Sequence, residues 1–427
     1  MRLLVVGSAV SGQAAARLAR RQGHEVAVYD TKAAAVATLR DESIEVHSGR
    51  WSPRLTKGFD AFIASPGISP AAEPLVQARD ARVPIWSELE YGSRFLDGPY
   101  VAVTGTNGKT TTVVAAAAML EASGLKAVAA GNVGTAVSSV ADEPWDVVVI
   151  EASSFQLAFI EDFHPSAAGI LNVAPDHLDW HGSFDAYASA KGRIFENMVA
   201  GDLLAFDADD PGATDLVAAA AISAVPCSGR TAPESGWGPV GNHLVVDGRE
   251  LSQPAIDGAF RLDLTIAAAL AFHAGATVDG VESVMRSFVP GAHRRHLVAR
   301  HRGVNWVNDS KATNPHAAVA AASSYDSVVL IAGGRNKGLD LGSMSGVPSV
   351  RAVVAYGEAA EELVAADPDR TTAVDSLADA VAAADQIAIA GDTVLLAPGC
   401  ASFDQFESYA QRGEVFSELV RQLGEDH

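Results

Sequence analysis

The sequence predicts an α/β protein of three domains, and three observations lead to this fold class. The chain has 427 residues, more than one hydrophobic core usually encloses, so two or three domains are expected. Short runs of Val, Ile, Leu and Ala alternate with helix-length segments, as in doubly wound sheets. This alternation restarts twice along the chain. We therefore place the domains at residues 1–97, 98–290 and 291–427.

The composition narrows the class of protein. Hydrophobic residues make up 48% of the chain and charged residues 19%, and no apolar run is long enough to span a bilayer. Two distant cysteines, Cys227 and Cys400, and a start without signal-peptide features favour the reducing cytoplasm. The formal charge of −21 disfavours nucleic acid but leaves small anionic ligands open. We expect a cytoplasmic monomer that binds small molecules and no membrane.

The first domain is expected to be Rossmann-like. An apolar run at residues 3–6 leads into a glycine turn and an Ala-rich helix, and the next strand ends at Asp30. The turn from Gly7 to Gly12 departs from the dinucleotide pattern G-x-G-x-x-G, because Ala9 replaces the middle glycine that lets the backbone approach a pyrophosphate. A nicotinamide cofactor is therefore disfavoured.

A phosphate-binding loop of P-loop type opens the central domain, which is expected to contain a mostly parallel sheet. The buried run YVAVT is followed directly by a Gly-rich segment and a long Ala-rich helix. Lys109 can reach the β- and γ-phosphates of a nucleotide, and the Thr110 hydroxyl can ligate Mg²⁺. The loop is shorter than the full eight-residue pattern, whose first glycine would stand at Val103. The residues expected to bind the nucleotide are Gly105, Thr106, Asn107, Gly108, Lys109, Thr110 and Thr111.

Further polar residues follow the other strands of the central domain. Glu151 ends the run WDVVVI, where a carboxylate can hold a divalent ion or simply solvate the sheet edge. The segment from Asp176 to Gly182 carries two carboxylates and two imidazoles and is a candidate metal shell, although each histidine taken singly is more typical of a structural residue. Spacing alone places Lys191 on a helix surface as a solvated charge.

The last domain is again expected to be Rossmann-like, with the strands VNWVN, SVVLIAGG, RAVVAYG and TVLLAPG. Lys311 follows the first of these strands among hydroxyl and amide neighbours, which suits a dicarboxylic ligand. Ser402 follows the last strand at the expected start of a helix. There it can offer its hydroxyl and free backbone N–H groups to a carboxylate, or act as an ordinary N-cap.

The motifs, taken together, carry a family resemblance. In order along the whole chain they are GTNGKTT, GNVG, EASSFQL, DHLDWHGS, AKGRIFEN, GAHRRH, NDSKATNP, GGRNKG and APGCASFDQF. This set resembles the Mur ligase family of the MurD type. The first few motifs are shared with the wider superfamily and its folylpolyglutamate synthase relatives, whereas NDSKATN followed by CASFDQF resembles the glutamate-adding branch.

The resemblance implies domains for UDP, ATP and an incoming amino acid, with two Mg²⁺ ions at the reaction site. It implies that Lys191 carries a carbamate, which would make it an anionic metal ligand rather than a solvated cation. The implied catalytic residues are Lys109, Lys191, His177 and Lys311. The implied metal ligands are Thr110, Glu151, His177 and Lys191, and Arg294 and Asp309 would reach the ATP. The implied substrate contacts are Ser11, Asp30, Thr31, Ser65, Gly67, Asn132, Ser153, Gln156, Lys311, Thr313, Lys337, Ser402, Phe403 and Tyr409.

The chain departs from the family pattern in two places. From Phe260 to Asp263 it lacks the His-Asn pair and the further Asn that the family places close to the nucleotide, so the resemblance assigns no adenine or ribose contact. Tyr409 stands where the family usually has Phe. For Asp30, a plain strand end without a ligand is an equally good interpretation.

The reaction implied by the resemblance is ATP-dependent joining of D-glutamate to UDP-N-acetylmuramoyl-L-alanine through an acyl phosphate, in peptidoglycan precursor synthesis. One alternative is a related ligase that adds L-glutamate or another amino acid, or acts on a folate. A second is an ATPase-like regulator without ligase chemistry, which the joint presence of Glu151, His177, Lys191 and Lys311 disfavours. A third, a nicotinamide-dependent oxidoreductase, has only the first α/β unit in its favour.

Overall fold

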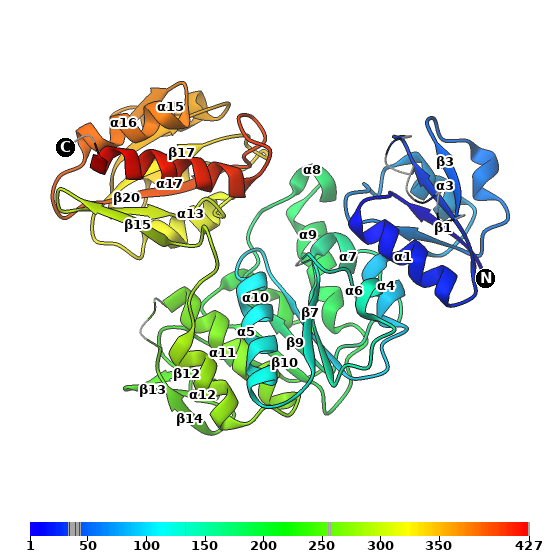
Figure 1. Ribbon diagram of the computed structural model, residues 1–427. Coiled ribbons are helices and arrows are strands. Elements are labelled where there is room, and N and C mark those ends of the chain that lie inside the picture. Colours follow the sequence, from blue (N-terminus) through cyan, green and yellow to red (C-terminus); the bar gives the residue numbers. More distant parts are fainter. Residues whose placement is uncertain are drawn as a thin grey trace. The chain divides into compact units, whose positions relative to one another are not determined.

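The computed structural model describes residues 1–425 except residues 33, 35–38, 40, 41, 43, 133, 255 and 257. The chain forms two compact units, one of residues 1–173 with 182–288 and one of residues 174–181 with 289–427. Both contain largely parallel sheets with helices packed on them (Figure 1), so the predicted α/β fold class is confirmed. The three domain boundaries proposed above remain a prediction.

A five-stranded parallel sheet begins the first unit. Its strand order β3-β2-β1-β4-β5 reverses beside β1, so the turns that follow β1 and β4 are neighbours at one edge. The strands are β1 (Arg2–Val6), β2 (Glu25–Asp30), β3 (Glu45–Ser48), β4 (Ala61–Ala64) and β5 (Ile85–Ser87). The helical segments are α1 (Val10–Arg21), η2 (Pro53–Thr56), α3 (Glu73–Asp80) and α4 (Glu88–Ser93).

A six-stranded parallel sheet follows in the same unit, with the order β11-β10-β9-β6-β8-β7. Strand β6 lies between β8 and β9, so the segments that follow these three strands share one edge. The strands are β6 (Tyr100–Thr104), β7 (Ala127–Gly131), β8 (Val147–Glu151), β9 (Ala167–Ile170), β10 (Leu203–Asp207) and β11 (Ala224–Cys227). The helical segments are α5 (Lys109–Ala122), α6 (Val137–Val140), α7 (Ser154–Leu157), α9 (Phe184–Gly192), η3 (Arg193–Phe195), α10 (Pro211–Val217), α11 (Gly258–His273) and α12 (Val278–Ser287).

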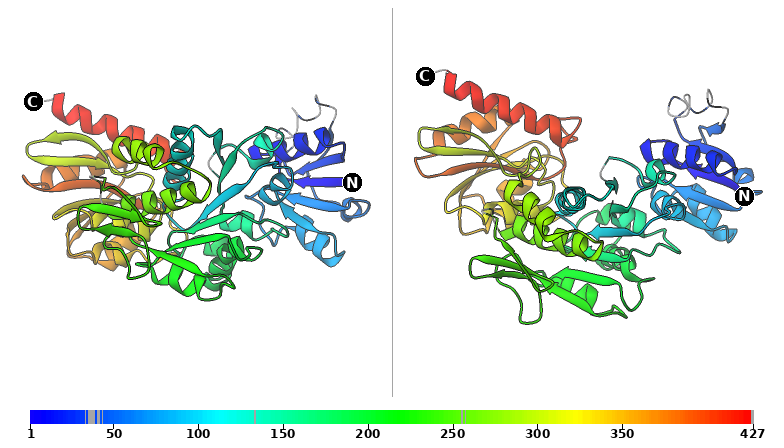
Figure 2. Two further views of the ribbon diagram at one scale, coloured as in Figure 1. Left: turned by 90° about the horizontal axis from the view of Figure 1, so that it is seen from below. Right: turned by 60° about the horizontal axis from the view of Figure 1, so that its bottom comes forward.

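Helices α5 and α11 pack side by side against this sheet (Figure 2). Val113 and Leu120 of α5 share one fully buried cluster with Ile266 and Leu270 of α11. Gly169 in β9 permits this close packing, because a Cβ there would lie 2.6 Å from Cγ2 of Ile266. Burying an aliphatic side chain of this size contributes about 1.5–3 kcal/mol. This packing therefore fixes the position of α11 relative to β9.

A small antiparallel sheet completes the first unit. It consists of β12 (Gly238–Val240), β13 (His243–Val246) and β14 (Arg249–Ser252). The core of the unit includes Leu244, Val246 and Leu251 from this sheet, which lie in the same cluster as α5 and α11.

The second unit contains a six-stranded sheet of order β15-β16-β20-β17-β18-β19, in which only β15 is antiparallel to its neighbour. The four strands expected from the sequence are all present. The strands are β15 (His296–His301), β16 (Val304–Asn308), β17 (Val328–Gly333), β18 (Val350–Tyr356), β19 (Thr371–Val374) and β20 (Thr393–Gly399). The helices are α8 (Leu178–His181), α13 (Pro315–Ala322), α14 (Gly342–Ser345), α15 (Ala360–Ala366), α16 (Leu377–Ile387) and α17 (Tyr409–Glu425).

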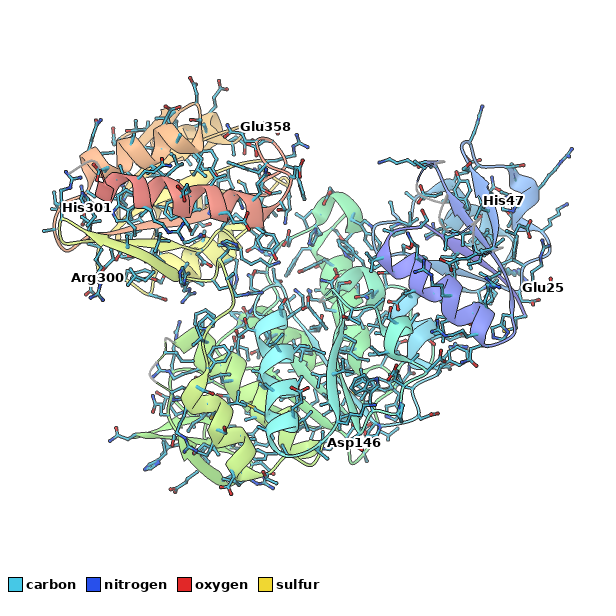
Figure 3. All side chains as sticks on the ribbon, viewed as in Figure 1. Glu25, His47, Asp146, Arg300, His301 and Glu358 are labelled. Carbon is cyan, nitrogen blue, oxygen red and sulfur yellow. The ribbon has the colours of Figure 1, made fainter. Side chains whose placement is uncertain are left out.

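Acidic side chains lie at several places on the surface of the protein. The side chains of Glu25, Asp146 and Glu358 are exposed and extend away from the ribbon (Figure 3). Within the residues that the structure describes, no helix combines the length and the apolar character needed to cross a membrane.

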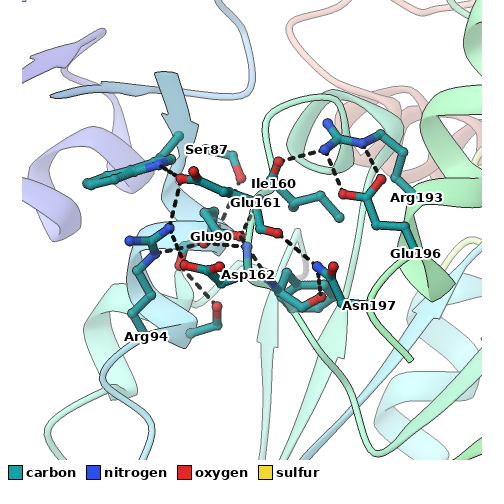
Figure 4. A network of polar contacts seen from close by, with 12 residues as sticks. Ser87, Glu90, Arg94, Ile160, Glu161, Asp162, Arg193, Glu196 and Asn197 are labelled. Atoms are coloured by element: carbon teal, nitrogen blue, oxygen red, sulfur yellow. Dashed lines mark hydrogen bonds and ion pairs between the residues drawn. The ribbon is translucent and has the colours of Figure 1, made fainter. Parts of the chain in front are cut away.

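A buried carboxylate connects the two large sheets of the first unit. Glu90 in α4 is fully buried, and its carboxylate accepts hydrogen bonds from the backbone N–H groups of Glu161 (2.9 Å), Asp162 (3.1 Å) and Phe163 (3.0 Å). The Nε of Arg94 donates a further bond of 2.7 Å (Figure 4). Backbone donors and a guanidinium together compensate the desolvation of this charge. Glu90 thus holds the helix after β5 against the segment before β9.

We predict that Glu90→Gln lowers the free energy of unfolding by about 2–4 kcal/mol, because an amide NH₂ would face backbone donors and the charge-assisted bonds would be lost. Urea unfolding measures the change. Glu161→Gln is the matched control, since the Glu161 side chain is 58% exposed and also pairs with Arg94. Equal stability of the two variants would contradict the prediction.

Candidate active site

The phosphate-loop candidate joins β6 to α5 at the edge shared with β8 and β9. Gly105 and Gly108 have φ angles of +150° and +89°, a region that side chains with a Cβ rarely adopt. Gly108 is the N-cap of α5. The N-terminus of the helix therefore lies at the carboxyl edge of the sheet, the arrangement that binds phosphate in nucleotide-binding proteins.

Asn172, just after β9, holds this loop in place. Its side-chain Oδ1 accepts from the backbone N–H of Asn107 at 2.8 Å, and its Nδ2 donates to the carbonyl of Asn107 at 3.2 Å. Its own carbonyl accepts from the N–H of Thr106 at 2.7 Å. The sequence analysis missed Asn172. A polar residue that ends the apolar run AAGIL was the available signal.

Two lysines meet on one carbonyl of the loop. The Nζ of Lys109 donates to Gly105 O at 2.8 Å and to Thr106 O at 3.0 Å. The Nζ of Lys191 donates to the same Gly105 oxygen at 2.7 Å and lies 4.5 Å from the ring centroid of Tyr187. Lys191 is only 1% exposed, so the expectation of a solvated surface charge is wrong. Two neighbouring ammonium groups repel each other, and this repulsion falls when an anion binds or when one lysine loses its charge.

Glu151 lies beside the loop at the end of β8, directly opposite Val103 of β6. Its side chain is 2% exposed, and Oε1 accepts from the Nδ2 of Asn132 at 3.0 Å. Its Oε2 is buried and receives no hydrogen bond in the part of the chain that the structure describes. A buried carboxylate oxygen without a donor is the kind of ligand that Mg²⁺ requires, so Glu151 fits the expected metal role.

Ser153 and Gln156 form a capping box at the start of α7. Gln156 Oε1 accepts from the Ser153 backbone N–H at 3.0 Å and from its hydroxyl at 2.8 Å, and Ser153 Oγ accepts from Gln156 N at 3.3 Å. Both side chains are buried. Their hydrogen bonds serve the helix start here, while Asn132 contacts Glu151.

The candidate metal shell from Asp176 to Gly182 stays a prediction. In the part of the chain that the structure describes, no group of three or more His, Cys, Asp and Glu residues is placed to hold a metal ion. The carboxylate of Asp176 instead accepts from Lys337 Nζ at 3.0 Å and from Asn314 Nδ2 at 3.1 Å, within the second unit. Burial opposes ionisation of Asp176, but the charges of Lys337 and His177 outweigh it and lower the pKa of this carboxyl. His177 itself has a φ of +51°, in the left-handed region.

The amino-acid candidates of the second unit gather at one sheet edge. Strand β20 lies between β16 and β17 and is parallel to both, so the segments that follow these three strands share one edge of the sheet. Lys311 follows β16, Lys337 follows β17 and Ser402 follows β20. The Nζ of Lys311 lies 3.7 Å from the ring centroid of Tyr409, so these two predicted residues meet.

Arg412 fixes two of these segments from behind, and the sequence analysis missed it. Its guanidinium is fully buried and donates to Ser310 Oγ (3.0 Å), Ser310 O (2.9 Å) and Cys400 O (3.2 Å). Ser310 precedes Lys311, and Cys400 lies two residues before Ser402. Arg412 therefore holds the backbone of both predicted substrate segments, although nothing in the local pattern around it signals that role.

The prediction that a helix starts at Ser402 is wrong. Ser402 is 2% exposed and its carbonyl accepts from the N–H groups of Gln405 and Phe406, which closes a single turn that does not continue. The next helix is α17, which begins at Tyr409. Phe403 is 64% exposed, so its side chain points to solvent in this structure. Thr313 is half-buried in the loop after β16.

Asp309 meets the segment that precedes β15. Its Oδ1 accepts from the backbone N–H of Arg295 at 3.2 Å, and its Oδ2 lies 3.9 Å from the Nε of Arg295. The expected neighbour Arg294 is half-buried next to this contact. The structure thus brings Asp309 to the Arg294–Arg295 pair.

The N-terminal turn is already engaged by a carboxylate. Asp30 Oδ2 accepts from the N–H and the hydroxyl of Ser8 at 2.9 and 2.7 Å. Burial opposes ionisation, but these bonds and the N–H of Lys32 outweigh it and lower the pKa of Asp30. Ser65 Oγ donates to Gly7 O at 3.0 Å, so the two turns at the strand-order reversal do meet. Of the remaining candidates, Thr31 and Gly67 are exposed, and Ser11 is partly exposed.

Comparison with known proteins adds a family context to this geometry. Residues 1–87 match the Mur ligase MurD-like N-terminal domain, residues 103–229 the Mur ligase middle domain, and residues 293–400 the Mur ligase glutamate ligase domain. The UDP-N-acetylmuramoylalanine–D-glutamate ligase of Frankia casuarinae is 42% identical over 98% of this chain and 93% of its own length. The enzyme of the same name from Thermobifida fusca is 39% identical over 99% and 98%.

Solved structures resemble the fold over its full length. The pseudomurein peptide ligase type C of Methanothermus fervidus has a TM-score of 0.62 at 17% identity, covering 99% of both chains. The UDP-N-acetylmuramate-alanine ligase of Thermotoga maritima has a TM-score of 0.59 at 18% identity, covering 100% of both chains.

We predict that Arg412→Gln destabilises the second unit by about 2–4 kcal/mol, because two buried carbonyls and a hydroxyl lose their donor. Denaturant unfolding measures this loss. Arg421→Gln serves as the control on the same helix, because the Arg421 side chain is 59% exposed. A loss of stability in Arg412→Gln no larger than in the control would refute the assigned role.

Proposed function

The chain belongs to the Mur ligase family and is an ATP-dependent amide-forming ligase, and from this premise we propose that it joins D-glutamate to UDP-N-acetylmuramoyl-L-alanine. The observation that carries the proposal is the full-length similarity to relatives that bear the name of this D-glutamate ligase. The phosphate loop beside Glu151 and the cationic edge beside Ser402 support it. The reaction would serve peptidoglycan precursor synthesis.

We assign one substrate to each of three parts of the chain. Residues 1–97 would bind the UDP portion, with Ser11, Asp30, Thr31, Ser65 and Gly67 near the diphosphate and uridine. Residues 98–290 would bind ATP, and residues 291–427 the amino acid. The cytoplasmic location and the monomeric state expected from the sequence remain part of the proposal.

The phosphate loop would bind ATP through backbone N–H groups at the start of α5 and through Lys109. Arg294 and Asp309 would complete the nucleotide contacts. Two Mg²⁺ ions would be held by Thr110, Glu151, His177 and a carbamylated Lys191, and their charge would neutralise the transferring phosphoryl group. The buried, donor-free Oε2 of Glu151 supports this role.

Activation of the acceptor is the chemical reason for ATP. A carboxylate is a poor electrophile, so its oxygen would first attack the γ-phosphorus and release ADP, giving an acyl phosphate. The amine of glutamate would then attack the acyl carbon, expel phosphate and lose a proton, which leaves an amide. Asn132, Ser153 and Gln156 would orient the muramoyl-peptide substrate. For Ser153 and Gln156 this requires a change of the hydrogen bonds that now form the capping box.

The diacid would be held at the sheet edge where β16, β17 and β20 end. Lys311, Lys337, Thr313 and Ser402 offer two ammonium groups and two hydroxyls, which suit two carboxylates. Phe403 and Tyr409 would contact the same ligand. Because Lys337 now pairs with Asp176, we propose that Asp176 orients this lysine toward the substrate.

We predict that phosphate release from ATP requires UDP-N-acetylmuramoyl-L-alanine and D-glutamate together, with L-glutamate about 100-fold or more less efficient in kcat/KM. A coupled phosphate assay with each enantiomer measures this. Omission of the muramoyl substrate is the control, and continued phosphate release without it would favour the ATPase-like alternative. Equal rates with L-glutamate, or turnover with a folate, would instead favour another ligase of the superfamily.

We further predict that Lys191→Ala lowers activity by about 100-fold and that short carboxylic acids such as acetate partly restore it. An added carboxylate would take the place of the carbamate. Lys109→Ala is the matched control, because Lys109 bonds the same Gly105 carbonyl but acts as a cation, which an acid cannot replace. Absence of rescue in Lys191→Ala would count against carbamylation.

A further inference from the structure

Helix α11 places a carboxylate directly against the phosphate loop. Asp263 is 6% exposed, and a Cβ built on Gly108 would lie 2.4 Å from its Oδ1 and 3.2 Å from its Cγ. Gly108 is the residue at which α5 begins. The carboxylate therefore lies at the N-terminus of α5, in the stretch where the chain departs from the usual family pattern.

Packing fixes the helix that carries Asp263. Its neighbour Leu264 and the following Ile266 are fully buried in the cluster that joins α11 to α5. Gly169 in β9 lies directly under Ile266. A shift of α11 away from the loop would break this packing, so the backbone of Asp263 keeps its place beside Gly108.

The charges near the loop act in opposite directions. Lys109 and the N-terminus of α5 attract phosphate, whereas Asp263 repels each negative charge that a nucleotide brings. Metal-free ATP carries about two more negative charges than its Mg²⁺ complex at neutral pH, because the ion is divalent. The repulsion from Asp263 is therefore larger for the metal-free nucleotide, and its removal changes the two affinities unequally.

We propose that Asp263 is a specificity-determining residue that makes the loop select the Mg²⁺ complex of the nucleotide over the metal-free form. The proposal rests on the ATP binding assigned under the proposed function. It goes beyond that function because it names the group that discriminates between two states of one ligand.

Nucleotide binding by the full chain tests this inference without turnover. Titration calorimetry would measure the dissociation constants of ATP with excess Mg²⁺ and with a chelator, for the wild type, Asp263→Asn and Asp263→Ser. We expect the ratio of the metal-free to the Mg²⁺ dissociation constant to fall by about tenfold in both variants. Asp279→Asn is the matched control, because Asp279 is exposed on α12 and its replacement changes the net charge equally.

Two outcomes would overturn the inference, and they are distinguishable. A ratio unchanged in Asp263→Asn and Asp263→Ser, both folded by circular dichroism, would overturn it alone. A ratio that falls equally in Asp279→Asn would do the same, because the effect would then follow net charge. A wild-type chain that binds neither form of ATP would overturn the proposed function as well.

Discussion

The paired hydrogen bonds between Asn172 and the backbone of Asn107 are the constraint on which the nucleotide site depends. A loop with two glycines at positive φ has many accessible conformations, and ordering it costs backbone entropy. Asn172, which follows the buried strand β9, offsets this cost. Its one side-chain amide binds both the N–H and the carbonyl of Asn107. The loop is thereby preorganised, and Lys109, Lys191 and Glu151 acquire defined positions around it.

A carboxylate lies at each of two glycine-containing turns in the first unit, the turn after β1 and the phosphate loop after β6. Asp30 accepts hydrogen bonds from Ser8 at the first turn, and Asp263 lies against Gly108 at the second. In a chain with a formal charge of −21, anionic ligands already meet an unfavourable field. Local donors must then supply the attraction, and acidic neighbours sharpen the dependence of binding on ligand charge. This balance between donors and acidic neighbours would therefore affect the choice between ligands of different charge more than the affinity for any one ligand.

The sequence predicts the framework well and the supports of the site poorly, for a physical reason. Buried parallel strands are continuous apolar runs, and the phosphate loop has a fixed local spacing, so both are visible in short windows of the chain. Asn172 lies 65 residues from Asn107, and Arg412 lies 102 residues from Ser310, so no local pattern connects these partners. The prediction of a helix at Ser402 is wrong for another reason. A single turn and the start of a helix share the same first hydrogen bond, so the sequence does not distinguish them.

Arg412 also explains how the proposed amino-acid site can be ordered before its ligand binds. Surface ammonium groups such as Lys311 are held weakly, since long side chains lose rotamer freedom when they are fixed. The buried guanidinium instead binds the backbone of two neighbouring segments, at Ser310 and Cys400. It orders the segments that carry Lys311 and Ser402 and adds positive potential from a low-dielectric interior. A residue behind the proposed site would therefore favour an acidic amino acid over a neutral one without occupying the space in which either would bind.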